Sequence, residues 1–147
     1  MYKHILIPTD GSPQSAKAIA GAVELAKATG AKVTGLFAAP PATPIFYRDH
    51  LPAGFGTMED HKRIIEDSAA KYLDVVVQAA KQAGVPCEVI NVTSDYPADT
   101  ILETAAKRSC DLIVMATHGR RGISSVLLGS ETQRVVTHAT IPVLVYP

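Results

Sequence analysis

The fold of this chain is decided by the stretch Lys3-His4-Ile5-Leu6-Ile7-Pro8-Thr9-Asp10-Gly11-Ser12-Pro13. Its first part belongs to a run over residues 2–8 in which hydrophobic residues follow one another without regular polar alternation. That pattern is typical of a parallel strand covered on both faces. Ser12 is a suitable N-cap, and Pro13 suits the first turn of a helix. The stretch therefore predicts a buried strand, a short polar turn and then a helix.

The same two kinds of segment alternate along the rest of the chain. Four more apolar runs are predicted as strands, at Ala31 to Ala38, Pro86 to Val92, Asp111 to Met115 and Pro142 to Tyr146. Segments with helical spacing separate them: Ser12 to Gly30, residues 58–83, a segment opening at Pro97, and Ser130 to about Ala139. This alternation predicts one α/β domain over residues 1–147, an open five-stranded parallel sheet with helices on both faces. Local physics leaves the strand order open.

The predicted helices have defined ends and buried faces. In the first helix, residues at helical spacing form the expected core stripe: Ala16, Ile19, Ala20, Val23 and Ala26. Gly30 is the expected C-cap of that helix. The last helix is expected to begin with a capping box over residues 130–133, in which Ser130 is the N-cap.

Composition restricts the class of protein. Lys and Arg together number 14, as do Asp and Glu, and 47% of the 147 residues are hydrophobic. These values are typical of a globular chain and argue against nucleic acid or an anionic membrane as a partner. No apolar run approaches the length of a signal or a membrane span, so we expect a cytoplasmic protein without a membrane partner. Cys87 and Cys110 are expected to be small buried hydrophobes.

Residues 40–57 depart from the alternation of strands and helices. They contain Pro40, Pro41, Pro44, Pro52, Gly54 and Gly56 and follow the second predicted strand. Loops of this length inside a compact domain are usually functional or disordered. A lid over a ligand and a mobile surface loop are equally compatible with the sequence.

The segment after the fourth predicted strand has the composition of an anion site. It reads Ala116-Thr117-His118-Gly119-Arg120-Arg121-Gly122 and continues to Gly129-Ser130. Glycines permit positive φ and allow backbone N–H groups to approach a ligand, and a helix N-terminus favours negative charge. Arg120 and Arg121 can add charged hydrogen bonds. A phosphate chain fits this pattern, although the Walker sequence and the dinucleotide fingerprint are both absent.

Together, these segments resemble the universal stress protein family. The resemblance rests on residues 5–12, on residues 112–122 with Gly129-Ser130, and on Ile141-Pro142-Val143-Leu144-Val145. It covers the whole chain and implies an adenine nucleotide alpha hydrolase-like fold with strand order 3-2-1-4-5. It also implies that Asp10 and the backbone near Ala38 hold adenine or ribose.

The match to the family's ATP-binding motif has one departure. Members that bind ATP carry Gly-x-x-Gly, nine residues, and then Gly followed by Ser or Thr. The spacing is intact in this chain, but Ala116 stands at the position of the first glycine. A Cβ there weakens binding modestly if the position needs positive φ. It blocks the site if ribose has to touch the backbone.

The candidate nucleotide site joins the turn after the first strand to the motif after the fourth. Its members are Pro8, Thr9, Asp10, Ala38, Met115, Ala116, Gly119, Arg120, Arg121, Gly122, Gly129, Ser130 and Glu131. The resemblance implies ATP as the ligand, with Mg²⁺ as a possible companion. The expected function is a stress-response nucleotide sensor in which any hydrolysis or autophosphorylation is slow.

Two alternative functions belong to other classes of protein. In one, the chain is a dimeric interaction module that does not use nucleotide. In another, it is an ATPase or phosphotransferase that uses Asp10 with Mg²⁺, although a single carboxylate supplies few ligands for the ion. Asp10 can also serve only to satisfy nearby N–H groups. The apolar last strand, Pro142 to Tyr146, is expected to lie at a sheet edge and to pair two copies as a homodimer.

Overall fold

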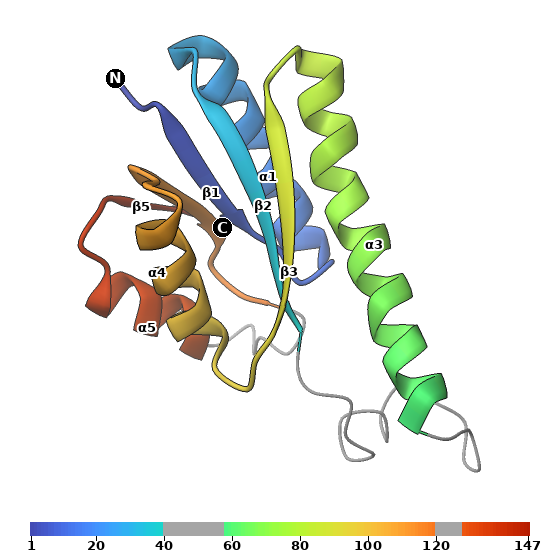
Figure 1. Ribbon diagram of the computed structural model, residues 1–147. Helices are drawn as coiled ribbons and strands as arrows, with labels where there is room; N and C mark the ends of the chain where they lie inside the picture. The colour runs from blue at the N-terminus through green and yellow to red at the C-terminus, as the bar shows by residue number, and fades with distance from the viewer. Residues whose placement is uncertain (40–57, 120–127) are drawn as a thin grey trace.

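The computed structural model describes residues 1–39, 58–119 and 128–147 (Figure 1). The predicted lid or loop at residues 40–57 lies outside these ranges, as do Arg120, Arg121 and Gly122. None of the described helices is long and apolar enough to cross a membrane. The elements are β1 (His4–Pro8), α1 (Pro13–Thr29), β2 (Lys32–Ala39), α3 (Met58–Ala83), β3 (Cys87–Thr93), α4 (Pro97–Lys107), β4 (Leu112–Ala116), α5 (Ser130–His138) and β5 (Val143–Tyr146).

The five strands form one parallel sheet in the order β3-β2-β1-β4-β5, as the family resemblance implied. β1 lies at its centre, with Ile5 level with Val33 of β2 and with Leu112 of β4. Helices α1 and α3 cover one face, and α4 and α5 cover the other (Figure 1). β5 is an edge strand, as predicted.

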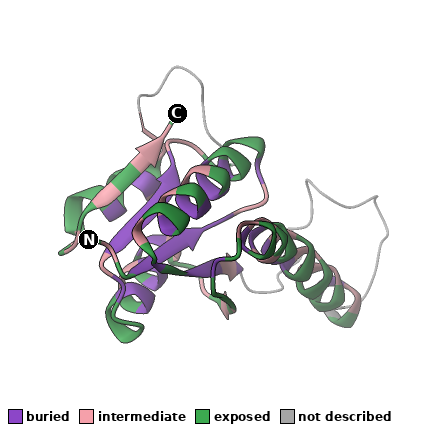
Figure 2. Ribbon diagram, turned by 90° about the horizontal axis from the view of Figure 1, so that it is seen from above, coloured by how far each residue is buried: buried purple, intermediate pink, exposed green. Residues whose placement is uncertain are grey.

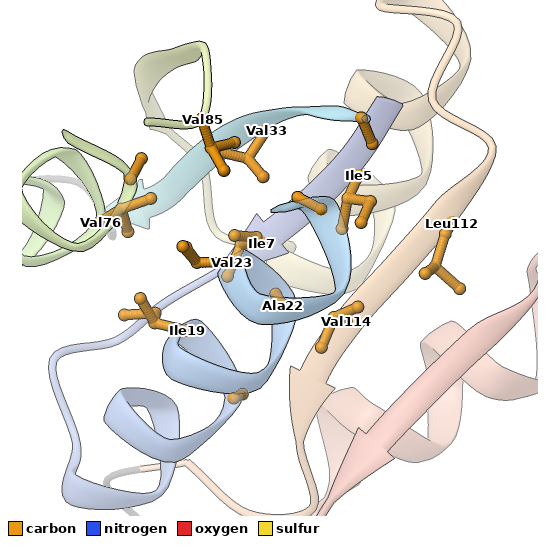
Figure 3. Close-up of a cluster of buried hydrophobic side chains, with 14 of the residues drawn as sticks. Ile5, Ile7, Ile19, Ala22, Val23, Val33, Val76, Val85, Leu112 and Val114 are labelled. Atoms are coloured by element: carbon orange, nitrogen blue, oxygen red, sulfur yellow. The ribbon is translucent and has the colours of Figure 1, made fainter. Parts of the chain in front are cut away.

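The side chains of β1 connect the two cores. Ile5 and Ile7 point into the cluster under α1 and α3, whereas Leu6 belongs to the cluster under α4 and α5 (Figure 3). All five residues of β1 are buried, and Figure 2 shows exposed residues on the outer faces of the helices. Because both faces of β1 are covered, its sequence has no solvent face, which explains the continuous apolar run.

The first helix agrees with the prediction at its ends and differs along its face. Ser12 accepts a hydrogen bond from the Ser15 amide at 3.1 Å, and Gly30 ends the helix with φ 74°. Ala16 and Ala20, predicted to be buried, are exposed. Ile19, Val23 and Ala26 are buried as predicted, and Ser15, Ala18 and Ala22 complete the observed core stripe. Several small residues sit at helical spacing in this helix, so periodicity alone did not place the stripe.

The predicted capping box of the last helix is wrong. Gly129 is the N-cap of α5, no side chain caps it, and Ser130 is the first helical residue. The Gly129 amide donates to the Thr117 carbonyl at 2.6 Å, and the Gln133 amide donates to the Gly129 carbonyl at 2.9 Å. The position where α5 begins is thus fixed by a contact with the chain after β4.

The two cysteines are both free thiols but differ in exposure. Cys110 is buried as expected, and burial raises its pKa to about 11. Cys87 is exposed, contrary to the prediction. It begins β3, which is an edge strand whose residues are mostly exposed, so an apolar run at this position is only partly covered.

A buried hydrogen-bond network closes the amino ends of the strands. The Nδ1 atom of His4 lies 2.9 Å from the Arg108 carbonyl, and Nε2 lies 2.6 Å from the Thr34 hydroxyl. Because a carbonyl only accepts, Nδ1 carries a proton. The Thr34 hydroxyl is also 3.0 Å from Glu88 Oε1, and its single hydrogen serves either Nε2 or Glu88. Neutral His4 takes that hydrogen, whereas protonated His4 releases it to Glu88.

The protonation of His4 is expected to lower stability. Burial, followed by the nearby charge of Lys32, holds the pKa of His4 below its usual 6.5. The hydrogen bond to the Arg108 carbonyl and the negative charges of Glu88 and Asp111 act in the opposite direction. The unfolded chain therefore binds this proton at a higher pH than the folded chain. The contribution of neutral His4 is present above 6.5 and is lost as the pH falls from 6.5 toward the folded pKa.

We predict that His4→Asn flattens the pH dependence of unfolding below pH 6.5. The wild-type free energy of unfolding should fall by up to about 1.4 kcal/mol per pH unit more steeply than that of the variant. Urea titrations at several pH values between roughly 5 and 7.5 measure the difference, in which the other histidines cancel. Parallel pH profiles for the two proteins would contradict the assignment.

Candidate functional site

A cavity of about 560 Å³ opens at the carboxyl ends of the strands. Every candidate site residue in the described ranges lines it: Pro8, Thr9, Asp10, Ala38, Met115, Ala116, Gly119, Gly129, Ser130 and Glu131. The other three candidates, at positions 120–122, lie outside those ranges. The cavity forms here because the chain leaves β1 toward α1 on one face and reaches α5 on the other face after β4. Such a divergence is where ligands bind in open parallel sheets.

Asp10 connects the turn after β1 to the loop after β4. Its Oδ1 accepts hydrogen bonds from the Ser12 amide at 2.9 Å and from the Ser15 hydroxyl at 2.7 Å. Its Oδ2 lies so close to Gly119 that a Cβ on that glycine would overlap it. One carboxylate oxygen therefore holds the first turn of α1, and the other approaches the phosphate-type motif.

Three hydrogen bonds fix the end of β4. The Ala116 carbonyl accepts from the Thr132 hydroxyl at 2.8 Å, and the Thr117 carbonyl accepts from the Gly129 amide at 2.6 Å. The Thr117 amide donates to the Tyr146 carbonyl of β5 at 2.7 Å. Together these bonds hold the N-terminus of α5 against the strand end, so its first backbone amides border the cavity.

The glycines of the motif have a different role from the predicted one. Among the described glycines, those with positive φ are Gly11, Gly30 and Gly84, and neither Gly119 nor Gly129 is among them. Gly129 has φ −63°, and a Cβ there would stand 3.2 Å from the Thr117 carbonyl oxygen and 3.4 Å from the His118 Cα. Glycine thus allows close approach at both positions, to the carboxylate of Asp10 at Gly119 and to backbone at Gly129, where a Cβ would require small shifts of its neighbours.

Ala116 sits in ordinary strand conformation. It is the last residue of β4 and is buried, and the described non-glycine residue with positive φ is Ser109. The first alternative, in which a Cβ at this position strains the backbone, is therefore wrong. Its methyl group packs in the core under α1 and also lines the cavity, so any effect on a ligand is steric.

The apolar walls include residues that the sequence did not point to. Leu36 and Ile101, which were not predicted, join the predicted Met115 on the side under α4. Phe37 and Tyr72 line the other side, with ring centroids 5.5 Å apart and an interplanar angle of 76°. Helical spacing allowed either Tyr72 or Leu73 to face the core. Leu73 is buried, whereas Tyr72 borders the cavity and covers Gly11.

The charges of the lining are mostly negative. The described residues that line the cavity include the carboxylates of Asp10, Asp95 and Glu131 but no Lys or Arg. The Nδ1 atom of His118 lies 3.1 Å from the Thr117 hydroxyl. No cluster of three or more His, Cys, Asp or Glu side chains suited to a metal ion occurs in the described ranges. A polyanion therefore meets backbone amides and acidic side chains in this part of the cavity.

Comparison with known proteins identifies the family. The model of the universal stress protein family matches residues 1–147. Universal stress protein MJ0531 of Methanocaldococcus jannaschii is 35% identical over 145 residues, which cover 99% of this chain and 82% of that protein. The structure of UspA from Lactobacillus plantarum superposes with a TM-score of 0.77 at 26% identity, covering 99% and 98% of the two chains.

A further similar structure was solved with a nucleotide. It is described as a universal stress protein in complex with cAMP, has a TM-score of 0.68 and 28% identity, and covers 98% of this chain and 95% of that one. The family model spans the whole sequence, and the fold superposes on these structures over nearly their full length. This chain therefore belongs to the universal stress protein family.

Proposed function

We propose that the chain binds an adenine nucleotide, with ATP as its main ligand, in the cavity between the ends of β1 and β4. The observation that carries the proposal is the convergence of the motif after β4 and the turn after β1 on one cavity of about 560 Å³. That volume lies within the range of small-molecule sites. The complex of a 28% identical universal stress protein with cAMP supports the same ligand class.

The lining suggests how the parts of the nucleotide are distributed. Pro8, Ala38 and Met115 provide apolar surface for the base. Phosphates suit the N-terminus of α5, because the first backbone amides of the helix and its dipole favour an anion there. α5 does not use Ser130 as its cap residue, so capping does not occupy that hydroxyl.

A sensor role fits this site better than rapid catalysis. One oxygen of Asp10 is held by the Ser12 amide and the Ser15 hydroxyl, which commits it to the first turn of α1. That oxygen is therefore not available as a general base, and only Oδ2 faces the loop after β4. Any hydrolysis or autophosphorylation should therefore be slow, and Mg²⁺ would arrive with the ATP phosphates.

A second candidate function is a dimeric interaction module that does not need nucleotide. It is favoured by the edge position of β5, where Leu144 is 39% exposed, and by Val136 of α5, which is 44% exposed. An apolar edge strand of this kind is suited to pairing with a second copy. We include homodimerisation through this edge in both proposals.

Thermal unfolding distinguishes the two candidates. Nucleotide at 100 times its Kd should stabilise the folded chain by about 2.7 kcal/mol and raise Tm by roughly 5–10 °C. Inorganic triphosphate with Mg²⁺ is the control for general ionic effects. If Tm is the same with and without millimolar ATP, ADP or cAMP while the protein is folded, the nucleotide proposal fails and the interaction module is left.

Gly129→Val should abolish nucleotide binding and leave the fold intact. The new side chain would press on the backbone of residues 117–118 and force apart the segments that border the cavity. The control is Ala20→Val, which adds bulk on the exposed side of α1, outside the cavity lining. Calorimetric titration measures binding, and circular dichroism measures folding. Full affinity in folded Gly129→Val would place the ligand elsewhere.

Ala116→Gly should lower stability without improving affinity. Because Ala116 carries no backbone strain, glycine relieves nothing there and increases the flexibility of the unfolded chain. The expected loss is about 1 kcal/mol in the free energy of unfolding, with ATP affinity within about threefold of wild type. A large gain in affinity would show instead that the methyl group obstructs the ligand.

A further inference from the structure

Glu131 joins the N-termini of two helices at the cavity. It lies in the first turn of α5, and its Oε2 accepts a hydrogen bond from the Ala98 amide at 2.9 Å. Ala98 is the second residue of α4, whose own N-cap, Tyr96, makes no side-chain capping bond. A residue 33 positions away thus provides the cap that α4 lacks. This contact ties the β3–α4 connection to the segment that follows the glycine motif.

Capping the Ala98 amide requires an acceptor but not a full negative charge, which the N-terminal dipoles of α4 and α5 also favour at this position. Asn, Ser and Thr cap helices about as well as an acid does, so a neutral acceptor would satisfy the Ala98 amide. Glu131 is half-buried and lines the cavity with Asp10 and Asp95. Its carboxylate repels an anion bound near the start of α5, and among the described lining residues no Lys or Arg offsets that repulsion.

We propose that Glu131 makes the cavity discriminate between adenine nucleotides by their phosphate charge. The proposal rests on the nucleotide function proposed above. Repulsion between its carboxylate and the ligand grows with every ionised phosphate oxygen, so it penalises free ATP most, AMP less and adenosine not at all. Mg²⁺ bound to the phosphates removes much of that charge. The triphosphate therefore binds preferentially as its magnesium complex.

The decisive variant is Glu131→Gln. Its amide oxygen can still accept from the Ala98 amide, so the bond between the helices is retained while the charge is removed. The matched control is Glu103→Gln, which causes the same change in net charge. Glu103 lies on α4, its side chain is 68% exposed, it pairs with Lys107 at 3.8 Å, and it does not line the cavity.

The experiment is calorimetric titration of the full chain with adenosine, AMP and ATP, the last with Mg²⁺ and with EDTA. Glu131→Gln should bind ATP in EDTA about tenfold more tightly than wild type and adenosine within about twofold. The factor by which Mg²⁺ improves ATP affinity should shrink to the same extent. Glu103→Gln should match wild type for all ligands.

The outcomes separate the two proposals. If wild type binds none of the ligands, adenosine included, the nucleotide function itself fails. If wild type binds them but Glu131→Gln leaves the ratio of ATP to adenosine affinity unchanged, the charge role of Glu131 is overturned and the site stands. Glu131→Ala removes both charge and bond and gives an independent answer. The charge role predicts the same gain in ATP affinity relative to adenosine, whereas a capping role alone predicts weaker binding of all three ligands.

Discussion

The structure depends on the pairing of β1 with β4 in a parallel sheet. β1 also pairs with β2, so it lies at the centre with covered faces, and the chain leaves it toward one face while the segment after β4 leads to the other. Two connections that diverge from adjacent strand ends leave a space that no short loop fills. The cavity thus follows from strand order, and the side chains in it determine only what the cavity accepts.

The two ends of the sheet differ in how their polar groups are used. At the amino ends, the Thr34 hydroxyl lies between His4 and Glu88 and connects three strands, and Asp111 accepts from the amides of Lys3 and His4. At the carboxyl ends, the hydrogen bonds hold loops and helix ends in place around an open space. In the first arrangement, the polar groups form hydrogen bonds that stabilise the fold. The second leaves the start of α5 at the border of the cavity, where a ligand can use it.

The sequence predicted the elements well because their signals are local. Continuous apolar runs marked buried strands, and Ser12 and Gly30 marked the ends of α1. Local sequence signals gave wrong or incomplete predictions where a contact between residues far apart in the chain determines the structure. The start of α5 is fixed by the Gly129–Thr117 bond, so Ser130 is not its cap, and the partner of Glu131 lies in another helix. Tyr72 and Phe37 were missed because a helix stripe and a strand run do not show which members reach a cavity. The strand order came from the family resemblance.

The glycine motif is best understood as three positions with separate physical requirements. The first is a strand end, where Ala116 shows that a Cβ is compatible with the fold. The second and third are close contacts that a side chain would crowd, against the carboxylate of Asp10 and against the backbone of residues 117–118. The negative charge beside the motif comes from a different residue, Glu131. In the proposed nucleotide site, shape and charge selection therefore reside in different residues, so a substitution at Glu131 would change which phosphates are tolerated without changing the cavity.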